Sequence, residues 1–438
     1  MKFVKNRIDI ISMGCSKNLV DSERLIKRFA NIGFEVHHDS SNVCGEIVVV
    51  NTCGFIGDAK EESINMILEL IEAKKLNKIG KIFVMGCLSE RYLTELKEEL
   101  PEVDRFYGKY NWDKIVDEIS INQPIKQIKS WERVLTTPPY SAYLKISEGC
   151  NRFCAYCAIP IITGRHKSRQ IEDIIEEVRY LVSQGVKEFN VIAQDLSYYG
   201  IDLYGEKKLG ELIERIAKIN GVEWIRLHYA YPVDFPYDVL DVMAKYPNVC
   251  KYLDIALQHI SDKVLYNMRR HIDKRATKEL IDIIRMKVPE IKLRTTLMVG
   301  FPGETEKEFD ELLQFVKDTK FERMGAFAYS EEDDTWAAKN LPDNISQDVK
   351  DKRLEQLMSI QEEISRELHN QMIGKNIKVI IDRIENNKLI CRSQWDSPEV
   401  DPEIHVSIQG NVAKFKGGDF INVCISKAYP YELEGILS

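Results

Sequence analysis

Three short apolar runs, each followed by an amphipathic helical pattern, organise the first 120 or so residues of the chain. The strand-like runs cover 8–12, 46–50 and 81–85, and the helical patterns cover 22–31, 59–73 and 90–100. Buried strands that alternate with helices are typical of a parallel sheet with helices on its faces. We therefore predict a small parallel α/β domain over residues 1–122.

The same alternation of strands and helices returns in the middle of the chain. Six strand-like runs occur, at 143–147, 188–193, 224–228, 252–257, 292–299 and 323–329. Six βα units predict a partial (β/α)6 barrel, in which residues that end the strands face one cavity. The residues expected there are Gln194, Asp195, His228, Tyr229, Gln258, His259 and Gly300.

The last part of the chain changes from a helical to a β-like pattern. A helical stripe over 350–372 ends before Gly374 and is expected to close the second domain, 136–372, as a connector helix. Beyond it, β-like runs at 377–382, 388–393 and 420–425 are separated by polar and glycine pairs. This pattern predicts a small β-barrel of the OB type over 373–438, so the whole chain is an α/β protein of three modules.

Composition limits the compartment and the partners. With 44% hydrophobic and 30% charged residues the chain is typical of a globular protein, and no apolar stretch is long enough for a signal peptide or a membrane span. We therefore expect a cytoplasmic protein without a membrane partner, in which cysteines stay reduced. The net charge of -8 argues against a large basic surface for nucleic acid and mildly favours a basic partner.

Cys150, Cys154 and Cys157 form a C-x3-C-x2-C triplet directly after the first predicted barrel strand. Three thiolates this close are expected to share one metal centre. A structural zinc site needs four ligands, and the next cysteine along the chain is Cys250. Three soft ligands with one open position favour a four-iron cluster, and the ligand count disfavours zinc, the alternative. We call these three residues the signature triplet.

Three further cysteines, Cys15, Cys53 and Cys87, each follow one of the amino-terminal strands and adjoin a glycine. Loops that follow parallel strands lie along one edge of the sheet, so these cysteines are expected to converge. We call them the amino-terminal trio and predict a second cluster site, with ordinary buried thiols as the alternative. The remaining four cysteines show no such pattern and are read as buried thiols: Cys44, Cys250, Cys391 and Cys424.

The triplet, with Tyr156 before its third cysteine, resembles the signature of the radical S-adenosylmethionine (SAM) superfamily. The three modules together are similar to the radical SAM methylthiotransferase family, whose last module is called TRAM. Several stretches resemble the members that modify an aspartate of ribosomal protein S12 more than the tRNA-modifying members of the MiaB type. They are 13–23, 50–56, 227–232, 254–259, 296–305 and 392–401. Ala256 stands where the family usually has proline, and we expect little effect.

The resemblance implies two [4Fe-4S] clusters, a SAM-cleaving one on the signature triplet and an auxiliary one on the amino-terminal trio. One SAM would methylate sulfur carried at the auxiliary cluster, and a second would supply a 5'-deoxyadenosyl radical. That radical would take a hydrogen from the aspartate β-carbon, which then acquires the methylthio group. No side chain is predicted as a conventional catalytic residue. Gln194 and Gln258, at strand ends, are expected SAM contacts, with packing as their alternative role.

Partners are predicted from the resemblance and from local charge. The carboxylates of Asp396, Glu399, Asp401 and Glu403 suggest an acidic face that attracts a basic ribosomal protein, although a solvated acidic loop would look the same. An electron donor such as flavodoxin or ferredoxin is also expected. Two alternatives stay open, a tRNA (adenosine) methylthiotransferase and a non-catalytic iron-sulfur electron-transfer or RNA-binding adaptor. Five basic residues between 151 and 169 contact substrate or solvate a loop: Arg152, Arg165, His166, Lys167 and Arg169.

Overall fold

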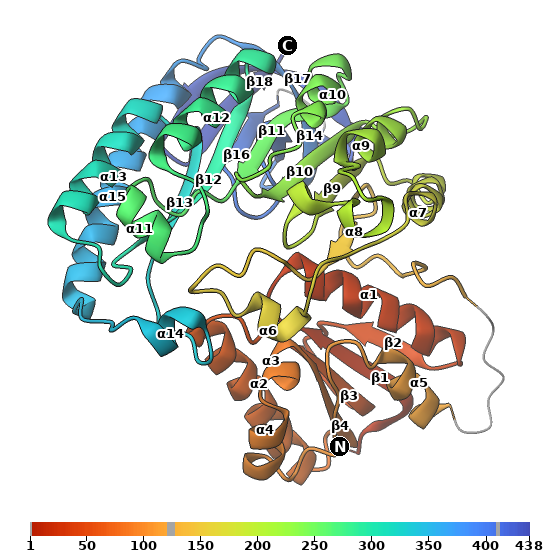
Figure 1. Ribbon diagram of the computed structural model, residues 1–438. Helices are drawn as coiled ribbons and strands as arrows, with labels where there is room; N and C mark the ends of the chain where they lie inside the picture. The colour runs from red at the N-terminus through yellow and green to blue at the C-terminus, as the bar shows by residue number, and fades with distance from the viewer. Residues whose placement is uncertain (1, 121–127, 409–411) are drawn as a thin grey trace. The chain divides into compact units, whose positions relative to one another are not determined.

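The computed structural model describes residues 2–120, 128–408 and 412–438 and divides into two compact units (Figure 1). The first unit holds the described residues up to Thr136 together with Glu148–Asn151 and Cys157–Lys167. The second unit holds Thr137–Ser147, Arg152–Tyr156 and the described residues from Ser168 onward. The predicted boundary at residue 122 lies outside the described residues. None of the described helices has the length and apolar character needed to cross a bilayer.

The first unit is built on a five-stranded parallel sheet in the order β2-β1-β3-β4-β5. The three predicted strands are confirmed as β1, β3 and β4, which are neighbours. Sequence patterns missed the two edge strands because one is polar and the other has two residues. The bounds are β1 Val4–Ser12, β2 Glu35–His38, β3 Gly45–Thr52, β4 Lys81–Gly86 and β5 Arg105–Phe106.

The helices of the first unit begin closer to the cysteines than the sequence predicted. The helix predicted over 22–31 begins at Ser16, directly after Cys15, and the one predicted over 90–100 is two helices that break at Tyr92. Tyr92 has φ -126° and ψ 38°, outside the helical region. The bounds are α1 Ser16–Asn31, α2 Gly57–Lys75, α3 Cys87–Arg91, α4 Leu93–Glu99, α5 Trp112–Ile119 and α6 Ile159–Thr163.

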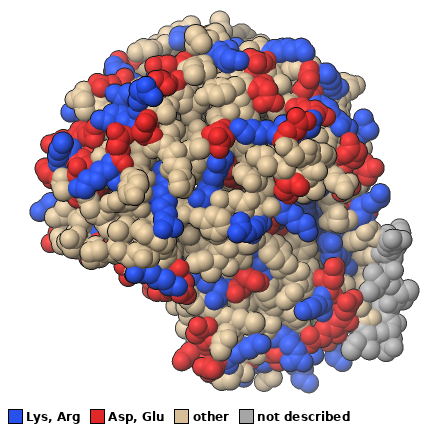
Figure 2. Space-filling view, in the orientation of Figure 1, with Lys and Arg blue, Asp and Glu red and all other residues tan. Residues whose placement is uncertain are grey.

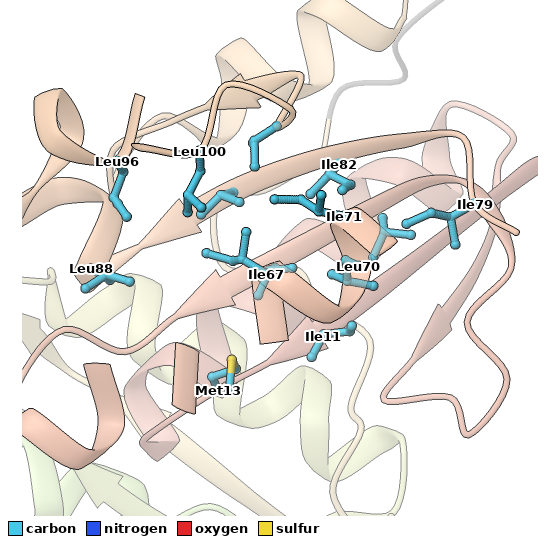
Figure 3. Close-up of a cluster of buried hydrophobic side chains, with 14 residues drawn as sticks. Ile11, Met13, Ile67, Leu70, Ile71, Ile79, Ile82, Leu88, Leu96 and Leu100 are labelled. Atoms are coloured by element: carbon cyan, nitrogen blue, oxygen red, sulfur yellow. The ribbon is translucent and has the colours of Figure 1, made fainter. Parts of the chain in front are cut away.

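Apolar side chains cover both faces of this sheet. On one face Ile67, Leu70 and Ile71 of α2 pack with side chains of β3 and β4 and with Leu96 of α4 (Figure 3). On the other face Phe29 of α1 belongs to a cluster with alternate residues of the same strands. Burial on both faces explains why the strands read as continuous apolar runs. The parallel direction of β1, β3 and β4 places the three cysteine loops at one edge of the sheet.

The second unit contains the predicted six-stranded parallel sheet, in the order β13-β12-β11-β10-β9-β6. The order follows the chain without a reversal, as a partial barrel requires. Its strands are β6 Ser141–Lys145, β9 Glu188–Ile192, β10 Trp224–Ala230, β11 Val249–Ile255, β12 Lys292–Val299 and β13 Arg323–Ala328. The two-residue strands β7 Ser147–Glu148 and β8 Lys167–Ser168 flank the loop that holds the signature triplet.

Helices connect the barrel strands, and a long helix follows the last one. Their bounds are α7 Ile171–Ser183, α8 Ile201–Tyr204, α9 Leu209–Ala217, α10 Asp238–Lys245, α11 Asp262–Asn267, α12 Lys274–Lys287, α13 Glu306–Thr319, α14 Trp336–Asn340 and α15 Gln347–Asn370, with a 3-10 turn, η1, at Leu196–Tyr198. The predicted connector is α15, which packs against β13.

The carboxyl-terminal module is a closed barrel, as predicted. It has five strands in the order β14-β15-β16-β18-β17, of which the sequence pattern indicated three, β14, β15 and β17. Its bounds are β14 Asn376–Glu385, β15 Lys388–Ser393, β16 Glu403–Ser407, β17 Phe420–Ala428 and β18 Glu432–Leu437, with a 3-10 turn, η2, at Val412–Lys414. Its core includes Val379, Leu389 and Val406.

Buried charges join this small barrel to the (β/α)6 sheet. Glu188 of β9 is fully buried between two arginines, Arg226 of β10 and Arg392 of β15. Arg392 Nη2 lies 2.8 Å from one carboxylate oxygen of Glu188, and Arg392 Nε lies 2.6 Å from Asp382 of β14. Arg226 also donates to the carbonyl of Ser393 at 3.2 Å. The guanidinium groups hold the pKa of Glu188 below its usual range although burial raises it.

Candidate metal centre

The amino-terminal trio lies at the carboxyl ends of three adjacent strands, as predicted. Cys53 directly follows β3, Cys87 directly follows β4 as the first residue of α3, and Cys15 precedes α1. Cys53 and Cys87 are buried, whereas Cys15 is exposed. All three carry free thiols.

Two glycines show how closely the three loops approach one another. A Cβ atom at Gly14 would lie 2.8 Å from Cys53 Sγ, so the loop that bears Cys15 lies against the Cys53 thiol. A Cβ atom at Gly54 would lie 2.6 Å from the backbone of Leu88, beside Cys87. Any larger residue at either position would push two cysteine loops apart. These glycines therefore bring the trio onto one small surface.

Asn18 ties the three loops together with a single amide group. Its Nδ2 donates to the carbonyls of Met13 and Thr52, at 3.1 and 3.0 Å, one residue or two before a cysteine. Its Oδ1 accepts from Cys87 Sγ at 3.5 Å. Sequence reasoning did not single out Asn18, because its partners are 34 and 69 residues away. The amide orders the loops on which the thiols stand.

The buried thiols of the trio are poor at ionising by themselves. Burial is the main cause that raises the pKa of Cys53, and burial raises the pKa of Cys87 to about 12. The neighbouring cysteines raise both pKa values further, and the Lys109 ammonium lowers them. A bound metal deprotonates coordinating thiols outright, so metal binding is the chemistry that suits such a group.

Among residues 2–120, 128–408 and 412–438, no three cysteine, histidine, aspartate or glutamate side chains are already arranged around a metal position. The donor set nevertheless fits a four-iron cluster, since three thiols converge on contiguous loops and soft sulfur ligands suit iron-sulfur centres. Metal binding commonly completes the ordering of its own ligands. The assignment of the trio therefore rests on its convergence and its chemistry.

The signature triplet is shared between the two units. Cys150 and Cys157 belong to the first, and Cys154 belongs to the second. Within the first unit, Cys150 N donates to the Gly164 carbonyl at 3.2 Å. Gly149 has φ +77°, and a Cβ there would lie 2.2 Å from the Arg165 carbonyl oxygen, so only glycine fits before Cys150.

In the second unit the Cys154 thiol contacts a buried arginine that sequence reasoning missed. Arg270 Nη1 donates to Cys154 Sγ at 3.3 Å and to the Tyr156 hydroxyl at 3.4 Å. The guanidinium is 2% exposed and stacks on the Tyr231 ring, 4.1 Å from its centroid. The arginine therefore places a buried positive charge beside one sulfur of the signature triplet. The one feature of the sequence that could have pointed to Arg270 is the adjacent pair Arg269–Arg270 just after α11.

Of the two expected SAM contacts, Gln258 has the clearer geometry. Its backbone N donates to Thr296 at 2.9 Å and its carbonyl accepts from Met298 at 2.7 Å, so β12 fixes it in place. It adopts φ +71°, a conformation that non-glycine residues rarely take. The side chain is 7% exposed, and its Oε1 has no hydrogen-bond partner among the described residues. A buried, unpaired amide oxygen at a strand end fits a polar ligand such as SAM. Gln194, just past β9, is half-buried and already takes part in interactions of its own.

Other expected cavity residues are held by protein partners. Asp195 pairs with Arg152 at 2.7 Å, and His259 Nε2 lies 3.2 Å from a carboxylate oxygen of buried Glu304. His228 and Tyr229 lie inside β10 rather than past it, because this strand continues to Ala230. In the basic loop, Arg152 and Arg169 are ion-paired, Arg169 with Glu177 at 2.7 Å.

We expect replacement of Gln258 by alanine to weaken SAM binding about tenfold, because a buried hydrogen bond to a ligand is worth roughly 1–2 kcal/mol. Iron content should stay unchanged, since the amide is not a metal ligand. Equilibrium dialysis of SAM with the reconstituted protein measures the effect. The matched control is Gln314→Ala, an exposed glutamine of α13 that donates to Asp318 at 2.7 Å. Equal SAM affinity in both variants would show that Gln258 only packs.

The prediction of an acidic face on the small barrel is wrong for most of the residues named for it. The side chains of Asp396 and Asp401 are buried. Asp396 pairs with Arg323 at 2.6 Å, and Asp401 pairs with Arg294 at 2.5 Å. Glu403 pairs with Arg383, which leaves Glu399 as the exposed carboxylate of this stretch. On the face drawn in Figure 2, positive and negative side chains are interspersed. Local charge on this stretch therefore does not discriminate a protein from a tRNA substrate.

Comparison with solved structures shows the fold. TsrM from Kitasatospora setae, a radical SAM methyltransferase, aligns over 74% of this chain and 75% of its own, with a TM-score of 0.57 and 15% identity. The cobalamin-dependent radical SAM enzyme OxsB aligns over 81% of this chain and 56% of its own, with a TM-score of 0.51 and 12% identity. Family models match the Radical SAM superfamily at 144–316, Uncharacterized protein family UPF0004 at 7–108 and the TRAM domain at 373–437. The central fold is that of radical SAM enzymes.

Curated relatives match nearly the whole chain. A "ribosomal protein uS12 methylthiotransferase RimO" of Phocaeicola vulgatus is 59% identical over 98% of both chains. One from Christiangramia forsetii is 48% identical over 98% of this chain and 94% of its own. This chain belongs to the family of ribosomal protein uS12 methylthiotransferases, RimO.

Proposed function

We propose that this protein adds a methylthio group to the β-carbon of an aspartate in ribosomal protein S12. Its RimO relatives are named for that substrate and cover the chain almost from end to end. The observation that carries the proposal is the second set of thiols, because the SAM-cleaving cluster accounts for the signature triplet alone. The amino-terminal trio, on three loops that Asn18 holds together, would provide a separate site for sulfur chemistry.

The two sets of cysteines divide the work. The signature triplet would hold the SAM-cleaving [4Fe-4S] cluster, and the amino-terminal trio the auxiliary one. When bound, the clusters and SAM supply the radical that breaks an unactivated C-H bond and the methylated sulfur, chemistry that side chains do not provide. Arg270 donates to Cys154, Gln258 offers its amide oxygen to SAM, and Asn18 orders the auxiliary loops. The expected electron donor is a flavodoxin or a ferredoxin.

We expect the reconstituted protein, given SAM and a reductant, to raise the mass of S12 by one methylthio group in place of a hydrogen. Tandem mass spectrometry should place the change on an aspartate. tRNA under the same conditions should stay unmodified. A methylthio group found only on tRNA would overturn the choice of substrate.

The same incubation tests the adaptor alternative. An electron carrier or an RNA-binding adaptor would bind clusters without cleaving SAM. We expect 5'-deoxyadenosine to form in the reduced protein, and chromatography of the reaction mixture measures it. Cluster-loaded protein that forms no 5'-deoxyadenosine would favour the adaptor.

A further inference from the structure

A buried lysine, Lys109, lies beside Asn18, the residue that ties the loops of the amino-terminal trio together. It follows the edge strand β5, and its side chain is 2% exposed. Its Nζ lies 3.1 Å from Asp21 Oδ2, which is equally buried on α1, and 3.3 Å from Asn18 Oδ1. Lysine is rarely buried this completely without a specific reason.

The Asn18 amide connects the Lys109 ammonium group to the amino-terminal trio by hydrogen bonds. Asn18 Oδ1 accepts from Lys109 Nζ and also from Cys87 Sγ at 3.5 Å. The Asn18 amide oxygen therefore lies within hydrogen-bond distance of both the Lys109 ammonium group and the Cys87 thiol.

Two carboxylates lie close to the Lys109 ammonium group, one buried and one partly buried. Asp21 is the nearest carboxylate, and Glu148, two residues before Cys150, lies 3.9 Å from Nζ. Both raise the pKa of Lys109 and keep it protonated despite its burial. A fixed positive charge therefore sits under a place where three thiolates would gather. Burial of an anionic centre is costly unless an opposite charge accompanies it.

We propose that Lys109 is a positioning residue that compensates the negative charge of the auxiliary cluster and raises its reduction potential, with Asp21 as the opposing charge. The proposal rests on the proposed function, since it requires a cluster on the trio. Reduction adds an electron to a centre already surrounded by thiolates, so a nearby cation favours the reduced state. The competing view is an ordinary buried ion pair, in which Lys109 only neutralises Asp21.

A charge cycle on the full-length protein separates the two views. The background is the Cys150→Ala, Cys154→Ala, Cys157→Ala variant, so that the auxiliary cluster is the one measured. Potentiometric titration followed by electron paramagnetic resonance compares four proteins: the background, and the background with Lys109→Met, with Asp21→Asn, or with both. Lys109→Arg tests rescue by charge. Iron is assayed in each.

Lys109→Met is expected to lower the ratio of reduced to oxidised cluster at least tenfold at a fixed ambient potential, a shift of about 59 mV for one electron. Asp21→Asn should shift the potential upward. The double variant, which restores the net charge, should return close to the background value, as should Lys109→Arg. A packing defect would not lower the potential in one single variant, raise it in the other and leave it unchanged in the double variant.

The other outcomes separate a charge effect from a packing effect. Unchanged reduction potentials would mean that Lys109 serves only as the ion-pair partner of Asp21. If Lys109→Met and Asp21→Asn shift the potential in the same direction, the cause is altered packing. If Lys109→Met loses its iron, an Asp21→Asn protein with an unshifted potential still refutes the charge effect, and one with a raised potential supports it. A background protein without iron would instead overturn the proposed function, and the inference with it.

Discussion

Replacing Cys15, Cys53 and Cys87 together by alanine is expected to abolish methylthiolation of S12 while SAM is still cleaved. The trio holds no part of the SAM-cleaving site in our assignment, so 5'-deoxyadenosine should still form. Iron per anaerobically reconstituted chain should fall from about eight to about four. Iron analysis, chromatography of the cleaved SAM and mass spectrometry of S12 measure the three effects in one preparation.

The chain supplies a matched control for this experiment. Cys44 lies in the same unit at the opposite end of β3, directly before the strand begins, whereas Cys53 directly follows it. Cys44→Ala should keep about eight irons and full methylthiolation, because its thiol is outside the converging loops. A triple variant that still transferred the methylthio group, or that lost all its iron, would contradict the separate roles of the two cysteine sets.

The sequence predicted the placement of the trio well because it depends on short-range rules. Three apolar runs with a cysteine after each suffice, once parallel strands bring their carboxyl ends to one edge. The flanking strands β2 and β5 escaped notice because edge strands bury little and leave a weak apolar pattern. Local patterning also failed at Tyr92, where one expected helix is two.

The polar neighbours of the site were beyond sequence reasoning because their partners are distant in the chain. Lys109 meets Asp21 across 88 residues, and Arg270 meets Cys154 across 116. The acidic stretch failed for the same reason, since Asp396 and Asp401 look solvated until Arg323 and Arg294 are placed against them. Charge along a sequence says nothing of charge on a surface until burial is known.

Glu188→Ala is expected to destabilise the second unit by about 3–5 kcal/mol, because it leaves Arg226 and Arg392 buried without their shared carboxylate. The urea midpoint of unfolding, followed at neutral pH, measures the loss. The control is Glu403→Ala, which removes a partly exposed partner of Arg383 and should cost less than about 1 kcal/mol. Equal losses in the two variants would mean that the buried network does not hold the small barrel to the sheet.

Lowering the pH should reduce the difference in stability between the wild type and Glu188→Ala. The pKa of Glu188 is lowered in the folded protein, mainly by Arg392 and Arg226 acting against burial. Its stabilising contribution is therefore complete above the unfolded pKa of about 4.3 and is lost as the pH falls from there toward the folded pKa. Urea midpoints compared at pH 7 and near pH 4 should show the wild type losing more stability than Glu188→Ala. If the difference in urea midpoint stays constant or grows at the lower pH, the Glu188 carboxylate is not ionised between its two arginines.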